Sequence, residues 1–240
     1  MKLIVTSGPP SVGKTSVLLH TLSHLKARGN KLAIAKLDCL VAGDEVAYER
    51  LGIEAITGLS TYVCPDHYLA TNIDRIIDWG RRKKTDFLII ESAGLCNRCS
   101  PHLDGVLAVT VMDILSGMKT PRKVGPLLKS ADLVVLTRGD LVSQAEREVF
   151  RVQVAMVNRK ARILEVNGLT GQGTLLLATQ FSEAQSFREG MQLQLRYPMP
   201  AAVCSFCLGE KRVGEAFASG NVRLMEFPDG RGRERNRTHD

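Results

Sequence analysis

The amino-acid sequence predicts an α/β fold of three layers, in which helices cover both faces of a mainly parallel sheet. Short apolar runs of strand length recur along the chain, and segments with helical spacing of apolar residues separate them. The 240 residues suffice for one such domain with a small appendage and are too few for two full enzymatic domains. In a fold of this class, ligands bind at the carboxyl ends of the strands.

The first half of the chain begins with a β-branched run at residues 2–6 (KLIVT), which predicts the first strand. A glycine-rich turn leads into a predicted helix at 16–28, where leucines recur at helical spacing. Residues 31–37 (KLAIAKL) predict the second strand, and the polar stretch 42–52 predicts a loop with a short helix. The amphipathic pattern of residues 66–82 predicts a longer helix.

The second half continues the alternation. Continuous apolar runs predict strands at residues 86–91, 106–112, 133–136 and 162–166. The pattern of residues 143–159 (SQAEREVFRVQVAMVNR) predicts a helix between the last two. These strands complete the predicted parallel sheet.

The alternation stops after about residue 186. The following segment has no pattern of a long helix, contains Pro198 and Pro200, and ends in a run rich in arginine. We therefore divide the chain into an α/β domain at 1–186 and a small C-terminal segment with a basic tail at 187–240.

The composition excludes several classes of protein. With 44% hydrophobic and 24% charged residues the chain is predicted to be globular, and no apolar run approaches the length of a membrane span. The start of the chain lacks the apolar stretch of a secretory signal, which predicts a cytoplasmic protein. The net charge of +7 is scattered outside residues 231–237, so phosphate ligands explain it better than nucleic acid does.

A phosphate-binding loop stands between the first strand and the first helix. Residues 8–15 fit the pattern GxxxxGK[ST], whose backbone N–H groups and helix N-terminus bind phosphate. Lys14 supplies a mobile positive charge, and Thr15 offers its hydroxyl to Mg²⁺. The motif identifies a P-loop NTPase. The predicted nucleotide-binding residues of this loop are Gly8, Pro9, Pro10, Ser11, Val12, Gly13, Lys14, Thr15 and Ser16.

Two acids close predicted strands beside this loop. Asp38 follows the second strand, and Glu91 ends the strand at 86–91. Carboxylates at these positions are candidates for orienting Mg²⁺, its waters and the attacking water. We therefore predict Lys14, Asp38 and Glu91 as the catalytic residues.

Two further segments indicate a guanine site. Thr137, Arg138 and Asp140 follow the strand at 133–136 in a pattern like the guanine-binding [NT]KxD motif of GTPases, with Arg138 in place of lysine. A carboxylate at Asp140 accepts hydrogen bonds from N1–H and the amine of guanine, and adenine lacks that amine. The segment beginning Asn167, Gly168 and Leu169 follows the last strand, where a loop closes over the base. 

Four of the six cysteines form two CxxC pairs, which are Cys96 with Cys99 and Cys204 with Cys207. In a reducing compartment such pairs indicate metal binding or redox chemistry in place of disulfides. Four thiolates suit a tetrahedral Zn²⁺ or an iron–sulfur cluster. For the second pair, a structural zinc and a functional site are both open.

With these motifs the sequence resembles the SIMIBI-class metallocentre-assembly GTPases, typified by the urease and hydrogenase accessory proteins. Asp38 and Asp44 are similar to the two acids of their first switch region, and Glu91 to Gly94 match their ExxG turn. Residues 112–141 resemble the urease accessory protein throughout, and NGLTGQG at 167–173 resembles its closing loop. The similarity covers about residues 1–180 and implies nucleotide-binding roles for Asp44 and Gly94.

The resemblance also implies a metal site. The urease-type protein holds metal with Cys-Pro-His, and this chain has Cys64-Pro65-Asp66-His67, one residue longer. Cys64 with His67 or His102 suits Ni²⁺ or Zn²⁺. Because Cys96 and Cys99 directly follow the ExxG turn, the metal and the nucleotide are expected to be coupled.

We therefore predict a GTPase that uses GTP and Mg²⁺ to deliver a transition metal (nickel, zinc or cobalt) or a metal cluster to a target metalloenzyme. The resemblance implies a nucleotide-dependent homodimer. Two alternatives stay open on the sequence: a P-loop small-molecule kinase, and a non-catalytic metal or iron–sulfur carrier whose nucleotide site is vestigial.

Overall fold

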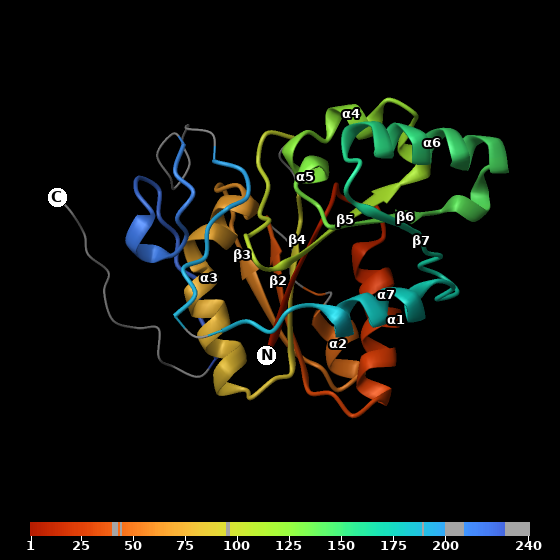
Figure 1. Cartoon of the computed structure of the whole chain (residues 1–240). Coiled ribbons are helices and arrows are strands. Elements are labelled where there is room, and N and C mark those ends of the chain that lie inside the picture. Colours follow the sequence, from red (N-terminus) through yellow and green to blue (C-terminus); the bar gives the residue numbers. More distant parts are fainter. Residues whose placement is uncertain (40–42, 44, 95–96, 189, 200–208, 229–240) are drawn as a thin grey trace.

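The computed structural model describes residues 1–39, 43, 45–94, 97–188, 190–199 and 209–228. It confirms the predicted three-layer α/β fold of the P-loop NTPases, with a sheet of seven strands that are all parallel (Figure 1). The strand order is β3-β2-β4-β1-β5-β6-β7. The strands are β1 Lys2–Ser7, β2 Leu32–Asp38, β3 Glu54–Leu59, β4 Phe87–Ser92, β5 Leu107–Asp113, β6 Leu133–Thr137 and β7 Arg162–Glu165.

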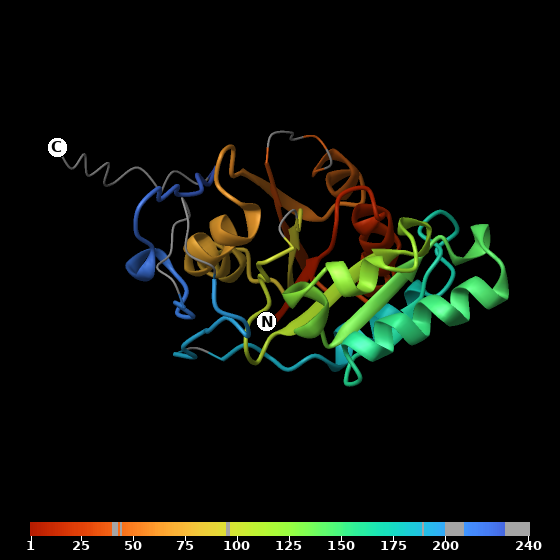
Figure 2. The ribbon, with the colours of Figure 1, turned by 90° about the horizontal axis from the view of Figure 1, so that it is seen from above.

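The helices cover both faces of this sheet. Helices α1, α2 and α7 pack on one face, and α3 packs on the other over β1, β2 and β4, while α4, α5 and α6 cover β5 and β6 on that second face (Figures 1 and 2). Their bounds are α1 Lys14–Ala27, α2 Glu45–Arg50, α3 Pro65–Arg82, α4 Thr120–Lys123, α5 Pro126–Lys129, α6 Gln144–Val157 and α7 Thr174–Glu183.

The core follows from the alternation of side chains along each strand. In β4, Leu88 and Ile90 face α3, whereas Ile89 faces α1 and α2. Both sets are fully buried, which explains why this strand is a continuous apolar run in the sequence. Among the helices that the structure describes, none is long and apolar enough to cross a membrane.

The sequence patterns did not predict every element. The structure adds the edge strand β3, helix α7 and the short helices α4 and α5. β3 (EAITGL) lies at the sheet edge, where only Ile56 and Gly58 are buried, so it carries no continuous apolar run. Gly58 of this strand packs closely against the side chains of Tyr68 and Leu37. A Cβ at this position would collide with both.

The described residues after 186, namely 187–188, 190–199 and 209–228, lie along α3 (Figures 1 and 2). Leu195 and Met225 are buried in the same core cluster as the apolar face of α3. The Met225 backbone N–H donates to Asn72 Oδ1 at 2.7 Å, and the Gly214 N–H donates to the carbonyl of Ala70 at 2.7 Å. The described part of this segment therefore shares the core of the nucleotide-binding domain. The domain boundary at 186/187 stays a prediction.

Arg196 fixes this segment to the loops that precede β5 and β6. Its guanidinium pairs with Asp132 through two hydrogen bonds of 2.7 and 2.8 Å. It also donates to three backbone carbonyls, those of Leu103, Val106 and Ser130, at 2.8–3.0 Å. All five N–H groups of a guanidinium can be satisfied by such an arrangement, which makes Arg196 the main polar anchor of the described C-terminal segment.

We predict that Arg196→Ala lowers the free energy of unfolding by about 2–4 kcal/mol, because it removes several charge-assisted hydrogen bonds at once. Urea denaturation measures this. Arg212→Ala is the matched control, since Arg212 belongs to the same segment but pairs with Glu210 at the surface. The anchoring role is wrong if both variants unfold at the urea concentration of the unchanged protein.

Candidate functional site

The loop between β1 and α1 has the geometry of a phosphate cradle. Gly13 adopts the left-handed conformation (φ 88°) at the start of α1, which a residue with a Cβ adopts only with strain. The Lys14 Nζ donates to the carbonyls of Gly8 and Pro9, each at 2.9 Å. Burial lowers the pKa of Lys14, and the nearby Glu91 opposes this effect. The ammonium is therefore held over its own loop, at the place where phosphate oxygens would compete for it.

A cavity of about 600 Å³ opens beside this loop. Three basic side chains and two acidic ones line it, so its charge favours an anionic ligand. The lining residues are Pro10, Ser11, Gly13, Lys14, Thr15, Ser16, Lys36, Leu37, Asp38, Glu91, Ala93 and Arg138. Most of the predicted phosphate and magnesium residues are thus brought together, and Lys36 is an addition that the sequence patterns did not identify.

Glu91 joins the loop to two other elements. Its Oε1 accepts a hydrogen bond of 2.8 Å from Thr15 Oγ1, and its Oε2 accepts one of 2.9 Å from the hydroxyl of Tyr48 in α2. Lys36 Nζ lies 3.5 Å from the same threonine oxygen. Glu91 is only 2% exposed. A buried carboxylate on the magnesium-side hydroxyl of a P-loop can orient that hydroxyl toward a cation.

Asp38, the other predicted acid, lines the same cavity at the end of β2. Its Oδ1 accepts the backbone N–H of Cys39 at 2.7 Å, which fixes the carboxylate at the strand end. Asp44, the second acid of the resemblance, lies outside the described residues.

The ExxG turn brings the end of β4 against the P-loop. Gly94 has a φ of 56°, and a Cβ there would lie 2.5 Å from the carbonyl oxygen of Gly8. Only a glycine lets the two backbones approach this closely. The predicted position of Gly94 beside the phosphate loop therefore has a steric basis.

The predicted base-binding residues divide between two places. Thr137 donates to the carbonyl of Val12 at 2.8 Å, which ties the end of β6 to the P-loop. Arg138 lines the phosphate cavity, where its guanidinium pairs with Asp113 and donates to the carbonyl of Ser11 at 2.8 Å. Because its head is held there by both partners, Arg138 bridges the P-loop and the end of β5.

Asp140 and Asn167 line a second cavity of about 360 Å³, together with Arg147 and Glu165. The Asn167 side chain accepts the backbone N–H groups of Leu169 and Thr170 at 2.9 and 3.0 Å, which shapes the closing loop. Gly168 packs against Ser16 and Val17 at the start of α1, where an added Cβ would lie 3.3 Å from the Cβ of Ser16. The closing loop thus lies against the helix that carries the P-loop.

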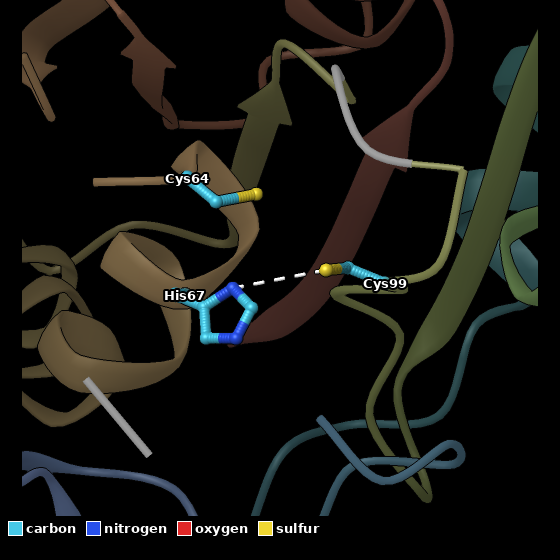
Figure 3. A group of neighbouring side chains, drawn as sticks. All are labelled: Cys64, His67 and Cys99. Atoms are coloured by element: carbon cyan, nitrogen blue, oxygen red, sulfur yellow. Dashed lines mark hydrogen bonds between the residues drawn. The ribbon is translucent and has the colours of Figure 1, made fainter. Parts of the chain in front are cut away.

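A cluster of soft ligands lies on the opposite face of the sheet (Figure 3). Cys64 directly precedes α3, His67 lies in its first turn, and Cys99 comes from the loop after β4. All three side chains point toward one another. Their ligand atoms lie within 4.8 Å of one another. His67 Nδ1 is 3.8 Å from Cys99 Sγ, against about 3.6 Å for two such ligands around one tetrahedral Zn²⁺.

The electrostatics of this cluster favour a cation. Hydrogen bonding from Cys99, followed by that from His67, lowers the pKa of Cys64 to about 4. The neighbouring Asp66 is fully buried, and burial together with the nearby Cys64 raises its pKa to about 7. Ser92 Oγ donates to Asp66 Oδ1 at 2.8 Å, while Oδ2 of Asp66 has no hydrogen-bond partner among the described residues. A thiolate, a second sulfur and an imidazole match the ligand preferences of Zn²⁺ and Ni²⁺.

The structure does not bring His102, the other predicted metal ligand among the described residues, to this cluster. His102 lies within hydrogen-bond distance of Ser7 Oγ at 2.9 Å and Ser130 Oγ at 2.8 Å, through its two ring nitrogens. Both nitrogens are thereby engaged in the core. Cys96, Cys204 and Cys207 lie outside the described residues, so their part in metal binding stays a prediction.

Several residues of the site were not identified from the sequence, among them Lys36, Tyr48 and Asp66. Lys36 could have been recognised, because a lysine inside a buried strand requires a polar partner or ligand. Tyr48 and Asp66 carry no such signal, since their roles depend on contacts with Glu91 and Ser92 far along the chain.

Known proteins resemble this chain in sequence and in fold. The family model of the CobW/HypB/UreG nucleotide-binding domain matches residues 2–165. An uncharacterized protein of Methanocaldococcus jannaschii is 46% identical over 226 residues, which are 94% of this chain and 97% of that protein. The urease accessory protein UreG of Yersinia pestis is 31% identical over 180 residues, which are 69% of this chain and 81% of UreG.

Among solved structures, HypB from Helicobacter pylori in complex with nickel aligns with a TM-score of 0.59 at 18% identity. The alignment covers 79% of this chain and 91% of HypB. At this identity the similarity shows the shared fold.

His102 provides a prediction on stability. Burial, with nearby Arg196, lowers its pKa to about 3, whereas an unfolded histidine titrates near 6.5. The unfolded chain therefore binds a proton that the folded chain excludes, and stability falls as the pH drops from about 6.5, by up to about 1.4 kcal/mol per pH unit from this residue.

Chemical denaturation of the unchanged protein and of His102→Gln at several pH values tests this. The difference in unfolding free energy between the two should shrink on going from pH 7 to pH 4. A difference that does not change with pH would show that His102 does not titrate in this way.

Proposed function

Because the chain belongs to the CobW/HypB/UreG nucleotide-binding family, we propose that it is a GTP-hydrolysing metallochaperone. It couples the state of its bound nucleotide to the capture and delivery of a transition metal, namely nickel, zinc or cobalt. The recipient is a target metalloenzyme or its maturation complex. The proposal agrees with the family match over residues 2–165 and with the chemistry of the two sites described above.

One observation carries the proposal: a soft-donor cluster and a P-loop cavity occur in the same small domain. The cluster has two sulfurs and one imidazole within 4.8 Å, and the cavity has the charge of a polyphosphate site. A nucleotide hydrolase alone has no use for the cluster, and a simple metal carrier has no use for an intact P-loop. The combination is what a nucleotide-driven metal carrier requires.

In the proposed reaction, water attacks the γ-phosphorus of GTP, the bond to the β,γ-bridging oxygen breaks, GDP leaves with that electron pair, and the proton of the water passes to the released phosphate or to solvent. Lys14 exchanges its two loop carbonyls for phosphate oxygens and neutralises their charge. Thr15 would hold the cation through its hydroxyl oxygen while Glu91 accepts the hydroxyl proton, and Asp38 would order water in the cavity. When bound, Mg²⁺ supplies charge neutralisation across the phosphate oxygens.

For the base, we propose that Asp140 recognises guanine. Its carboxylate lines the cavity next to Asn167, and two acceptor oxygens match the N1–H and amine of that base. The closing loop from Asn167 to Leu169 contributes the cover over the base. Arg138, held by Asp113 and Ser11, links this region to the phosphate site.

For the cargo, we propose that Cys64, His67 and Cys99 bind the metal from one chain. Three protein ligands leave a fourth position for a water or for a ligand of the recipient, as metal transfer requires. HypB from Helicobacter pylori was solved with nickel bound, which supports a transition metal as cargo. We further propose a nucleotide-dependent homodimer that acts in the cytoplasm. A metal cluster at the CxxC pairs is the alternative cargo.

The guanine assignment predicts that Asp140→Asn reverses the choice of base. An asparagine amide donates to the C2 carbonyl of xanthine, whereas it loses an acceptor for the guanine amine. The affinity for GTP should fall by at least about 100-fold relative to that for XTP, since a polar site strongly rejects a mismatched hydrogen-bond pattern. Calorimetry with GTP, XTP and ATP measures it. An unchanged preference would remove Asp140 from the base site, and a preference for ATP in the unchanged protein would favour the kinase alternative.

The cargo assignment predicts that Cys99→Ser weakens metal binding by at least about tenfold, because a hydroxyl is a poor ligand for a soft cation. GTP affinity should stay within about threefold of the unchanged protein. Cys39→Ser is the matched control: Cys39 is a partly buried thiol whose Sγ lies near the Thr61 carbonyl, outside the cluster.

Elemental analysis and absorption spectra of anaerobically purified protein, with and without GTP, provide the measurement. They also distinguish nickel, zinc and iron–sulfur cargo. Equal metal content in both cysteine variants and in the unchanged protein would contradict the proposed ligand set.

A further inference from the structure

The end of β4 sends consecutive side chains to the two sites. Along a strand, neighbouring side chains point to opposite faces of the sheet. Glu91 therefore points toward α1, where it accepts the hydroxyl of Thr15 at 2.8 Å. Ser92, the next residue, points toward α3, where it donates to Asp66 at 2.8 Å. One peptide unit thus separates the contact with the P-loop from the contact with the helix of the soft-donor cluster.

Asp66 lies between two of the cluster residues. It is the second residue of α3. Cys64 directly precedes the helix, and His67 directly follows Asp66. Its Oδ1 is held by Ser92, and its Oδ2 is buried with no hydrogen-bond partner among the described residues. A buried carboxylate with an unsatisfied oxygen destabilises a fold unless a nearby positive charge offsets it. A metal ion bound by the neighbouring ligands would provide that charge.

We propose that Ser92 and Asp66 are positioning residues that transmit the nucleotide state to the metal ligands. Their hydrogen bond connects α3 to the residue that follows Glu91. This proposal rests on the proposed function. When Glu91 is drawn toward a cation at Thr15, the strand end that carries Ser92 shifts with it. Asp66 then moves the first turn of α3, and with it Cys64 and His67, relative to Cys99.

Small displacements are sufficient for such a mechanism. Metal–ligand bonds tolerate only about 0.2 Å of deviation, so a shift of a few tenths of an ångström in one turn of helix changes the affinity. The ExxG turn adds a constraint, because Gly94 lies against Gly8 of the P-loop and the chain then continues to Cys99. The two halves of the ligand set are thus attached to the same strand end, one through Ser92 and the other through the backbone.

The charge of the nucleotide determines which nucleotide state binds the metal more tightly. A bound triphosphate carries one more negative charge than a diphosphate, and the contacts of Glu91 with Thr15 and of Ser92 with Asp66 place that charge one peptide unit of β4 away from the helix of the cluster. Added negative charge near the cluster favours a divalent cation there. The triphosphate state should therefore bind the metal more tightly, and hydrolysis should loosen it.

The test is a titration of the full chain with Co²⁺, followed by the thiolate-to-cobalt absorption band, in the presence of GDP or a non-hydrolysable GTP analogue. For the unchanged protein we expect the ratio of the two affinities to be at least about fivefold. In Ser92→Ala the ratio should fall to below about twofold, while Co²⁺ still binds with the same band and both nucleotides bind as before.

The matched control is Thr110→Val, which removes another buried strand hydroxyl, one that donates to the Leu127 carbonyl at 3.0 Å. It should keep the ratio of the unchanged protein. Asp66→Ala removes the other end of the link and should also lower the ratio of the two Co²⁺ affinities. The double variant with Ser92→Ala should lower this ratio no further than either single variant does.

The outcomes separate the two proposals. A ratio near one in the unchanged protein would contradict the proposed function and remove the signal that the link transmits. A preserved ratio in Ser92→Ala, or additive losses in the double variant, would overturn the Ser92–Asp66 link and leave the proposed function standing.

Discussion

The hydrogen bond between Thr15 and Glu91 is the interaction on which the arrangement of both sites depends. It joins the first turn of α1 to the end of β4, a strand that lies in the sheet between β1 and β2. The same carboxylate accepts the hydroxyl of Tyr48, so α2 is tied to the same point. Because Glu91 is buried, its charge must be satisfied by these neighbours or by a cation, and three elements are therefore held in a fixed relation to the P-loop.

The parallel sheet explains why two different chemistries meet here. All carboxyl ends of the strands lie at one edge, so the loops after β1, β2 and β4 are neighbours. Alternation of side chains then separates hard from soft donors: the oxygens of Thr15 and Glu91 lie on the α1 face, and the sulfurs and imidazole of the cluster lie on the α3 face. Oxygen ligands suit Mg²⁺ and sulfur ligands suit transition metals, so in the proposed function the two cations would bind on opposite faces of the sheet.

The sequence predicted most of this framework. Six of the seven strands carry continuous apolar runs, and the P-loop motif stands where a strand passes into a helix, so both could be recognised. β3 could not, since at the sheet edge it buries only alternate residues and contains Gly58. Within the site, Glu91 was predicted from its place at a strand end. The link from Ser92 to Asp66 was not, because a hydrogen bond between residues 26 positions apart leaves no local pattern. His102 shows the converse: a histidine near a CxxC pair suggests a ligand, yet in the fold its ring lies between Ser7 and Ser130.

The most direct measurement follows the metal during nucleotide turnover. Protein loaded with Ni²⁺ or Zn²⁺ is mixed with GTP and Mg²⁺ in the presence of a coloured chelator, and phosphate release and metal capture are recorded in the same single turnover. The account predicts that metal capture accelerates together with phosphate release, and that a non-hydrolysable analogue gives no acceleration. Metal capture at one rate with GTP, with the analogue and without nucleotide would contradict it.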